Sequence, residues 1–362
     1  MTYGKAIRIA LFGTLVVLAA GIYILSERHQ LVERWYSSGL FPPLAVALRF
    51  TLGSIPFSLG DLLYAGVLLY VCRELFLFVR MLLQKTGWRQ ALVPLQKAAL
   101  LLLFVYVYFY LFWGLNYYRL GIAHQLSLRP TAFSQSELQV LTTRLLKKAN
   151  QTRAACEASN DTIMLPQRMF TAAQAGYRNL HRVYPFIRYQ HPSLKPSLFG
   201  RLGNYVGFQG YYNPFTGEGQ INTRIPNFVQ PFVTCHEMAH QLGYASESEA
   251  NFVGFLAAVH SADTLMMYSS YLDMFLYAWG NLRLTDSVMA GKITPLISEG
   301  VKRDIRTLQQ FSRKHRTFLQ DWTDRLYDFY LRRNRQKNGI QSYTEVTAWL
   351  IGYSKKFPAD WL

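Results

Sequence analysis

The chain has 362 residues and a formal net charge of +17, and hydrophobic residues make up 51% of it and aromatic residues 15%. Its mean hydropathy of +0.05 is too high for an ordinary soluble domain and too low for a protein embedded wholly in lipid. These values predict a membrane region joined to a water-exposed domain.

Three apolar segments near the N-terminus are long enough to cross a membrane as helices. They cover residues 6–25, 62–79 and 98–115. The first has a basic start, but no clear small-x-small cleavage site follows it and further spans do, so we expect a retained anchor rather than a signal peptide. Arg73 and Glu74 interrupt the second span, either as a buried functional pair or as partners of each other.

A fourth apolar stretch, residues 40–57, carries three prolines and Arg49. Because these residues disrupt a membrane helix, we expect a re-entrant or interfacial segment here rather than another span.

Basic residues near the spans predict how the membrane region is oriented. Lys5 and Arg8 mark the start of the first span, and the short connection between the second and third is also basic. Cytoplasmic connections are enriched in Lys and Arg, although the first connection is basic too. We therefore predict a multi-pass protein of the cytoplasmic membrane, in which residues 1–119 form the membrane region and residues 120–362 an extracytoplasmic domain.

The sequence predicts that the domain after residue 119 is mainly helical, with one strand-forming stretch. Residues 207–214 favour hairpin strands, and residues 219–223 favour a short edge strand. Amphipathic helices are expected both before and after this stretch. The sequence thus predicts a mainly α fold (α+β), with a small antiparallel sheet beside the helix that carries the motif described next. The expected helices cover residues 134–158, 166–184, 268–284, 293–322, 323–335 and 342–353.

The pentapeptide His236-Glu237-Met238-Ala239-His240 carries the strongest chemical signal in the chain. Helical residues at i and i+4 share a face, so both imidazoles can hold one Zn²⁺ ion, and Glu237 can act as a general base toward water. Pro231 and Gly243 fit the start and end of such a helix. The alternative is that the histidines are hydrogen-bonded core residues and Glu237 caps the helix turn.

The third metal ligand is expected from the segment just downstream, where Glu247 and Glu249 are both candidates. Glu249 can be explained by a structural role instead, because it would complete a capping box with Ser246. Glu247 lies one turn before Asn251, whose amide could orient a metal ligand. We favour Glu247, although spacing leaves both open.

The segment from Glu247 to Phe252 resembles the glutamate signature of gluzincin peptidases, Glu-x-x-Ala-Asp or Glu-x-x-Ala-Asn. This resemblance implies that Glu247 is the third ligand and Asn251 its supporting polar group. The spacer after His240 is shorter than those families usually have. The metzincin pattern fails because Ser246 stands at the place of its third histidine.

More broadly, the chain is similar to a bacterial family of uncharacterised membrane proteins with a zincin-like C-terminal part. The similarity runs through Trp113-Gly114-Leu115-Asn116-Tyr117-Tyr118-Arg119, through Gly210-Tyr211-Tyr212-Asn213-Pro214 and through the histidine motif. It implies a zincin-like fold but no substrate.

Substrate-binding residues are expected near the strands. In zincins an edge strand pairs with an extended peptide, so the resemblance points to the stretch that holds Gln220 and Asn222. Tyr211, Tyr212 or Tyr244 could donate a hydrogen bond to an oxyanion, although packing explains each of them better in a chain with 24 tyrosines.

The cysteines and the basic residues give weaker signals. Cys156 and Cys235 could form one disulfide, which the sequence leaves open, and Cys235 should face away from the metal. The basic side chains suit anionic lipid or wall polymers, although a solvated helical surface explains each single residue better, and no nucleic-acid motif is present. These basic side chains are Lys302, Arg303, Arg306, Arg313, Lys314, Arg316, Arg332, Arg333, Arg335 and Lys337.

Together, these motifs predict a membrane-anchored zinc metallopeptidase. His236, His240 and Glu247 would hold the ion, and Glu237 would move the proton from water to the leaving amine. The alternatives are a non-catalytic sensor or scaffold with a structural zinc site, and a hydrolase of envelope amides or esters.

Overall fold

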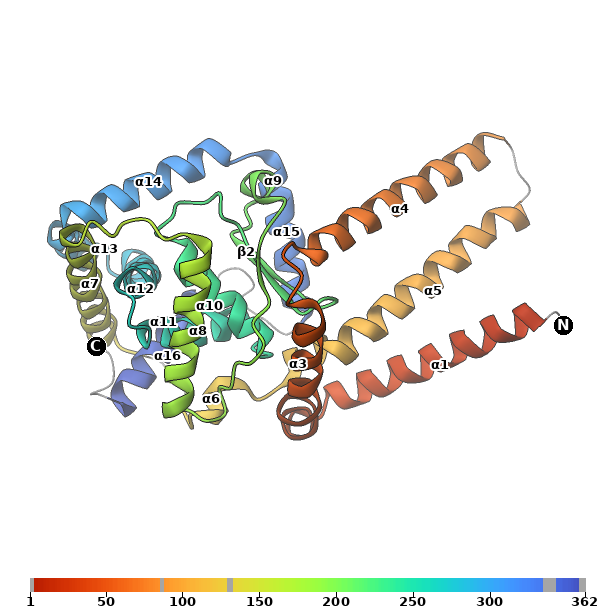
Figure 1. The fold of residues 1–362 in the computed structure, drawn as a ribbon, viewed down its shortest axis with the longest axis horizontal. Coiled ribbons are helices and arrows are strands. Elements are labelled where there is room, and N and C mark those ends of the chain that lie inside the picture. Colours follow the sequence, from red (N-terminus) through yellow and green to blue (C-terminus); the bar gives the residue numbers. More distant parts are fainter. Residues whose placement is uncertain (1–2, 85–87, 129–132, 335–342, 358–362) are drawn as a thin grey trace.

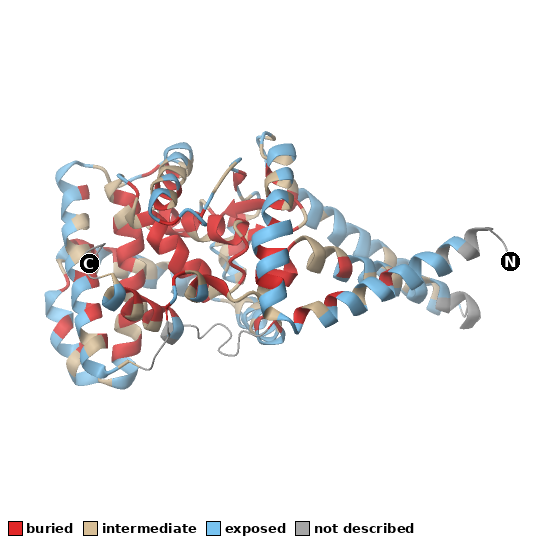
Figure 2. Cartoon of the chain, turned by 90° about the horizontal axis from the view of Figure 1, so that it is seen from below, coloured by how far each residue is buried: buried red, intermediate tan, exposed pale blue. Residues whose placement is uncertain are grey.

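The structure is a computed structural model that describes residues 3–84, 88–128, 133–334 and 343–357. Three long helices extend to one side of a helical body (Figure 1). They are α1 (Tyr3–Ser26), α4 (Leu59–Leu83) and α5 (Trp88–Phe112). All three are long and apolar enough to cross a membrane, and little of their surface is buried within the protein (Figure 2). The three predicted apolar helices are therefore confirmed.

The charged residues within α4 contact each other rather than a neighbouring helix. The guanidinium of Arg73 donates to the carboxylate of Glu74, and the side chains are 65% and 33% exposed. They do not form a buried pair.

The connection between the first two long helices is itself helical and packs on the body. It comprises α2 (His29–Leu31), the π-helix η1 (Val32–Leu40) and α3 (Phe41–Leu52). Arg49 of α3 is buried and donates to the backbone carbonyls of Gln190 and Gln241, at 3.0 and 2.8 Å. The stretch predicted to be re-entrant or interfacial is thus held against the C-terminal part of the chain by these bonds.

A second buried contact ties this connection to the body. The carboxylate of Glu33 accepts hydrogen bonds from Nε and Nη2 of Arg119, at 3.1 and 2.9 Å, and from the backbone nitrogen of Leu120 at 3.0 Å. Arg119 also donates to the carbonyl of Gly243, at 3.1 Å. Burial alone would raise the pKa of Glu33, but the charge and hydrogen bonds of Arg119 outweigh it and hold the pKa below its usual value.

We expect Glu33→Ala to destabilise the fold by about 3–5 kcal/mol, because it leaves the guanidinium of Arg119 buried without its partner. Thermal unfolding of the full-length protein in detergent at neutral pH measures this loss. The exposed Glu299→Ala is the control and should change little. The pKa of Glu33 is lowered on folding. The stability that its ion pair gives the folded protein is therefore present above the unfolded pKa of Glu33, and it is lost as the pH falls through the folded pKa. Equal melting temperatures for the two variants would contradict the role of this ion pair.

The body is built mainly from helices that pack around α10, α11 and α12. α10 packs against α11, α12 packs against α7, and α8 and α16 cover the group from other sides. Buried residues concentrate in this part of the chain (Figure 2). The helices are α6 (Gly121–Gln125), α7 (Gln135–Ala158), α8 (Pro166–Val183), α9 (Gly200–Val206), α10 (Gln230–Gln241), α11 (Glu247–Val259), α12 (Thr264–Thr285), α13 (Ser287–Ile293), α14 (Glu299–His315), α15 (Phe318–Arg333) and α16 (Tyr343–Lys356), with short 3₁₀ turns η2 (Gly114–Tyr118) and η3 (Thr294–Leu296).

Most of the predicted helices are confirmed, but the expected helix over 293–322 is wrong at both ends, since α14 begins only at Glu299, after α13 and η3. Ser134 caps α7 in a capping box with Glu137, and α8 opens on Pro166. The predicted division after residue 322 lies instead at Thr317. Thr317 has an extended backbone, and its side chain accepts a hydrogen bond from the backbone nitrogen of Gln320, which starts α15 there.

The sheet has three short strands, β1 (Leu194–Pro196), β2 (Gly210–Asn213) and β3 (Glu218–Ile221), in the order β1-β3-β2. β3 pairs antiparallel with β2 and parallel with β1. The predicted small sheet is confirmed, but it is mixed rather than antiparallel. The predicted edge strand is also wrong, because β1, too short to recognise from its sequence, covers the far side of β3. Within this sheet, β2 is an edge.

Candidate metal centre

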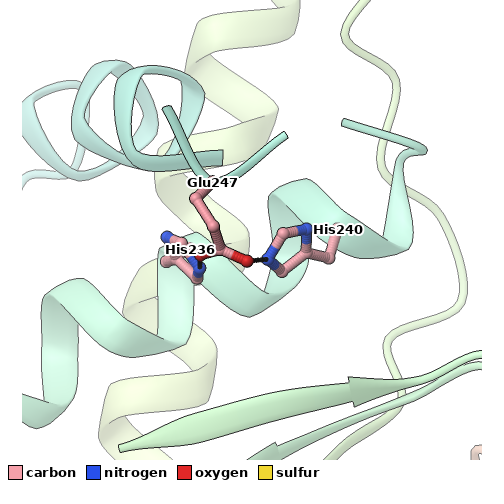
Figure 3. A group of neighbouring side chains, drawn as sticks. All are labelled: His236, His240 and Glu247. Atoms are coloured by element: carbon pink, nitrogen blue, oxygen red, sulfur yellow. Dashed lines mark ion pairs between the residues drawn. The ribbon is translucent and has the colours of Figure 1, made fainter. Parts of the chain in front are cut away.

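The histidine motif lies on α10, which begins and ends as its sequence predicts. Pro231 occupies the first turn, and Gly243 follows the helix with φ of +83°. This left-handed conformation suits glycine and turns the chain back toward the helix. His236 and His240 consequently lie one turn apart on one face (Figure 3).

The next helix, α11, crosses α10 closely enough to bring a carboxylate to the two imidazoles. Gly254 makes this approach possible, since a Cβ there would lie 2.9 Å from the backbone nitrogen of His236. The first residue of α11 is Glu247, and its side chain points at both histidines (Figure 3).

The three side chains form a compact cluster of donor atoms. Nε2 of His236 lies 3.3 Å from Oε2 of Glu247, and Nε2 of His240 lies 3.6 Å from Oε1 of Glu247. One ligand atom from each of the three residues lies within 4.8 Å of the others. Two nitrogens and one carboxylate oxygen are a donor set that suits zinc and leaves a further coordination position.

The other ring nitrogen of each histidine is held by a hydrogen bond. Nδ1 of His236 lies 2.7 Å from Oδ1 of Asn251, and Nδ1 of His240 lies 2.8 Å from the carbonyl oxygen of Tyr244. Both partners are acceptors, so they favour the tautomer that carries the proton on Nδ1 and keep the lone pair on Nε2. The predicted contact of Asn251 with a candidate ligand is therefore present.

We expect Asn251→Ala to weaken zinc binding by about 10–100-fold, because the ring of His236 would lose the acceptor that orients it. The Kd for zinc, measured by competition with a coloured chelator, tests this effect. Asn222→Ala is a matched control, since Asn222 is also buried but bonds to Asn204 and the carbonyl of Phe208 instead. If the two variants bind zinc equally well, Asn251 does not support the site.

The structure separates the two glutamates that the sequence left as alternatives. Glu249 does not face the histidines. Its Oε1 accepts a hydrogen bond from the backbone nitrogen of Ile122 at 2.8 Å, and no side-chain cap is present at Ser246, so the capping box considered for Glu249 is absent too. Glu247 is the carboxylate that the fold brings to the cluster.

Charges within the cluster perturb one another strongly. Burial raises the pKa of Glu247, but His236 and His240 outweigh it and lower that pKa to about 2. Burial lowers the pKa of His240 to about 4. It acts in the same direction on His236, but hydrogen bonding and charge from Glu247 raise that pKa to about 9. When no ion is bound, these shifts favour a negative Glu247 beside a positive His236.

Glu237 is buried next to the cluster with part of its carboxylate unsatisfied. Its Oε2 has no hydrogen-bond partner among the described residues, and burial raises its pKa to about 8. Gly210 of β2 lies directly against it, since a Cβ at that position would be 2.7 Å from Oε1 of Glu237. Glycine at this position leaves room for the carboxylate.

These residues open into a cavity of about 830 Å³ between the helical body and the bases of the long helices. Tyr64 of α4 and Phe109 of α5 contribute to its wall, as do residues 210–212 of β2 and several residues of α15. An adjoining cavity of about 650 Å³ shares Phe232 and Asp273 with it.

The candidate substrate residues divide into two groups. Tyr211 and Tyr212 line the cavity, although the hydroxyl of Tyr211 donates to Asp61. The other three lie elsewhere and are not brought to the cavity. The amide of Gln220 donates to Ser58 and Glu218, Asn222 bonds to Asn204 and Phe208, and the hydroxyl of Tyr244 donates to Gln125.

The chain matches a known sequence family. A family described as "Protein of unknown function (DUF3810)" matches residues 36–351, which include the metal cluster and all residues of the cavity wall. The chain belongs to the DUF3810 family. No curated protein and no solved structure matches it.

Two cavity residues of the DUF3810 protein were missed by sequence reasoning. The hydroxyl of Tyr327 in α15 donates to Oε1 of Glu247 at 2.5 Å. Asp273 of α12 lines both cavities and makes no hydrogen bond or ion pair with any described residue. Neither residue belongs to a motif, and both reach the site only through long-range packing. His260, at the end of α11, bonds through Nδ1 to the carbonyl of Leu256.

The cysteines of the DUF3810 protein take no part in the cluster. Cys156 and Cys235 are both buried and free, so they form no disulfide in this structure. Cys235 faces the core, with its sulfur 3.6 Å from that of Met266, as its position next to His236 predicts.

Proposed function

We propose that this protein is a membrane-anchored, zinc-dependent hydrolase, and specifically a metallopeptidase. The observation that carries the proposal is the cluster of His236, His240 and Glu247 in the same cavity as the buried carboxylate of Glu237. A structural zinc site would more often use four protein ligands and would have no need of an additional acid beside it.

The residues of the site fit a zinc ion. Both Nδ1 atoms are occupied by acceptors, both Nε2 atoms face one carboxylate, and a further acid lies within the cavity with an unpartnered oxygen. When bound, zinc would supply Lewis acidity toward a carbonyl group and toward water. His236, His240 and Glu247 would hold it.

The remaining chemistry is assigned to the chain's own side chains. Glu237 would take a proton from the attacking water and return it to the leaving amine. Asn251 and the carbonyl of Tyr244 would keep the two imidazoles oriented. Tyr212 is our candidate for a hydrogen bond to the developing oxyanion, because the hydroxyls of Tyr211 and Tyr244 are engaged elsewhere.

Strand β2 is the best candidate for holding an extended peptide. One of its edges pairs with β3, and the other pairs with no strand in the part of the chain that the structure describes. Residues 210–212 also line the cavity. A peptide added along this edge would pair through its backbone and pass the metal cluster. The sequence predicts this peptide-binding role for residues 219–223, but β3, which contains most of them, is the central strand of the sheet.

The resemblance to gluzincins supports the same assignment. Glu247 and Asn251 hold the positions that the gluzincin pattern gives to the third ligand and its supporting group, and both contact the histidines here. We therefore propose a zincin-like arrangement, with an unusually short connection between the two helices.

We propose that the catalytic part lies at the outer face of the cytoplasmic membrane. The basic residues that flank the first long helix and join the second to the third favour a cytoplasmic position for those ends. Three crossings would then place the cavity outside, where exported or membrane-bound peptides are its substrates.

The proposal is tested by comparing protein N-termini in cells that contain either the parent protein or the Glu237→Gln variant at equal amounts. We expect a set of envelope-protein N-termini that appears only with the parent. If the two sets are identical while envelope amides or esters differ, the substrate is not a peptide. If nothing differs, the site is a sensor or scaffold rather than an enzyme.

A further inference from the structure

One face of α15 carries a row of large apolar side chains that the protein leaves uncovered. Phe318, Trp322, Leu326 and Phe329 follow one another at intervals of four, four and three residues, which places them on one side of a helix. They are 75%, 62%, 56% and 68% exposed. We call these four residues the α15 stripe. Four large apolar side chains in a row on a water-facing helix mark an interaction surface.

Helix α15 lies beside the ends of the apolar helices that are long enough to cross a membrane (Figure 1). The hydroxyl of Tyr110 in α5 donates to Asn334, just after α15, at 2.8 Å. The hydroxyl of Tyr117 donates to that of Tyr330 in α15 at 3.2 Å. Because Tyr110 lies two residues before the end of α5, these bonds hold α15 at the depth where that helix would leave the lipid.

The charge around the stripe is positive. Between residues 313 and 333 the chain has six Lys or Arg residues and three Asp residues, a balance of +3. All six basic side chains are exposed. The excess comes from Arg313, Lys314 and Arg316 just before α15, since the three Arg residues of α15 balance its three Asp residues. An amphipathic helix with aromatic residues on one face and basic residues beside it is typical of helices that lie in the headgroup layer of a membrane.

We infer that α15 is an interfacial helix, with the α15 stripe inserted into the bilayer that α1, α4 and α5 enter. Helix α15 is bonded to the end of α5, the stripe and the long helices all expose large apolar side chains, and the nearby basic residues match anionic headgroups. A second protein molecule would explain the stripe but not its place at the end of α5.

Insertion of the stripe places the mouth of the metal cavity at the membrane surface. Leu326 belongs to the stripe and also lines the cavity, and the next residue, Tyr327, bonds to Glu247. Substrates would reach the cavity from the headgroup layer, as membrane-bound or juxtamembrane segments. The inference about α15 itself holds whether or not the site hydrolyses anything.

The test uses the full-length protein in nanodiscs of phosphatidylcholine and phosphatidylglycerol. Single cysteines replace Phe318, Trp322 or Phe329, and Asp321 as the control, in a Cys72→Ser background. The two remaining native cysteines are buried and should not react. Asp321 is exposed on the same helix but lies outside the stripe. Each cysteine receives a nitroxide, and its collisions with oxygen, which favours lipid, and with a water-soluble nickel complex are measured.

We expect the ratio of oxygen to nickel collisions to be several-fold higher at the three stripe positions than at Asp321→Cys. The substituted side chains are exposed, so the substitutions should not disturb folding. Equal ratios at all four positions would overturn the inference. So would stripe labels that neither reagent reaches in nanodiscs or in detergent, because protein would then cover the stripe.

Discussion

Replacing Glu237 by glutamine should lower the turnover of a cleaved peptide by about 10²–10⁴-fold, the contribution expected of a general base. Zinc should remain bound, since Glu237 is not one of the three clustered ligands. Glutamine has the same shape and can occupy the space that Gly210 leaves, so the cavity should persist. Turnover of a peptide identified from the cellular comparison measures the effect on the purified protein.

Glu345→Gln provides the control for this loss of a carboxylate. Glu345 lies on α16, where it accepts a hydrogen bond from Ser248, and it does not line the metal cavity. We expect its turnover to match that of the parent. Full activity in Glu237→Gln, with zinc bound, would show that another group moves the proton.

The second large effect is on zinc binding, which should depend on only one of the two neighbouring glutamates of α11. Glu247→Gln should weaken zinc binding by more than the about 10–100-fold expected for the supporting residue Asn251, because it removes the only carboxylate of the cluster. Glutamine can still accept the hydrogen bond of Tyr327, so the helix packing should survive. Chelator competition on the purified variant gives the Kd.

Glu249→Gln is the matched comparison for that measurement. It lies two residues away on the same helix and is buried, but its carboxylate faces the backbone of Ile122. The amide oxygen of glutamine can accept that bond, so zinc binding should be unchanged. The reverse outcome, with zinc lost in Glu249→Gln and kept in Glu247→Gln, would reassign the third ligand.

Local features of the site could be predicted because they depend on neighbours in sequence. The spacing of His236 and His240 fixes their common face, and Gly243 marks the end of α10 wherever the helix packs. The same reasoning found the start of α7 and the three apolar helices.

Features that depend on distant contacts could not be predicted. Glu249 is turned from the metal cluster by the backbone of Ile122, which lies 127 residues earlier in the chain. Tyr327 reaches Glu247 across 80 residues. The expected edge strand became central because the three-residue strand β1 pairs with it from outside the hairpin. None of these partners leaves a periodic or spacing signal.

The zinc content of the purified full-length protein tests the central claim most directly. Elemental analysis should find about one zinc ion per chain in the parent, the same amount in Glu237→Gln, and none in a folded His240→Ala variant. A parent protein that holds no zinc after purification without chelators, and takes up none when zinc is added, would contradict the metal centre and the hydrolase built on it.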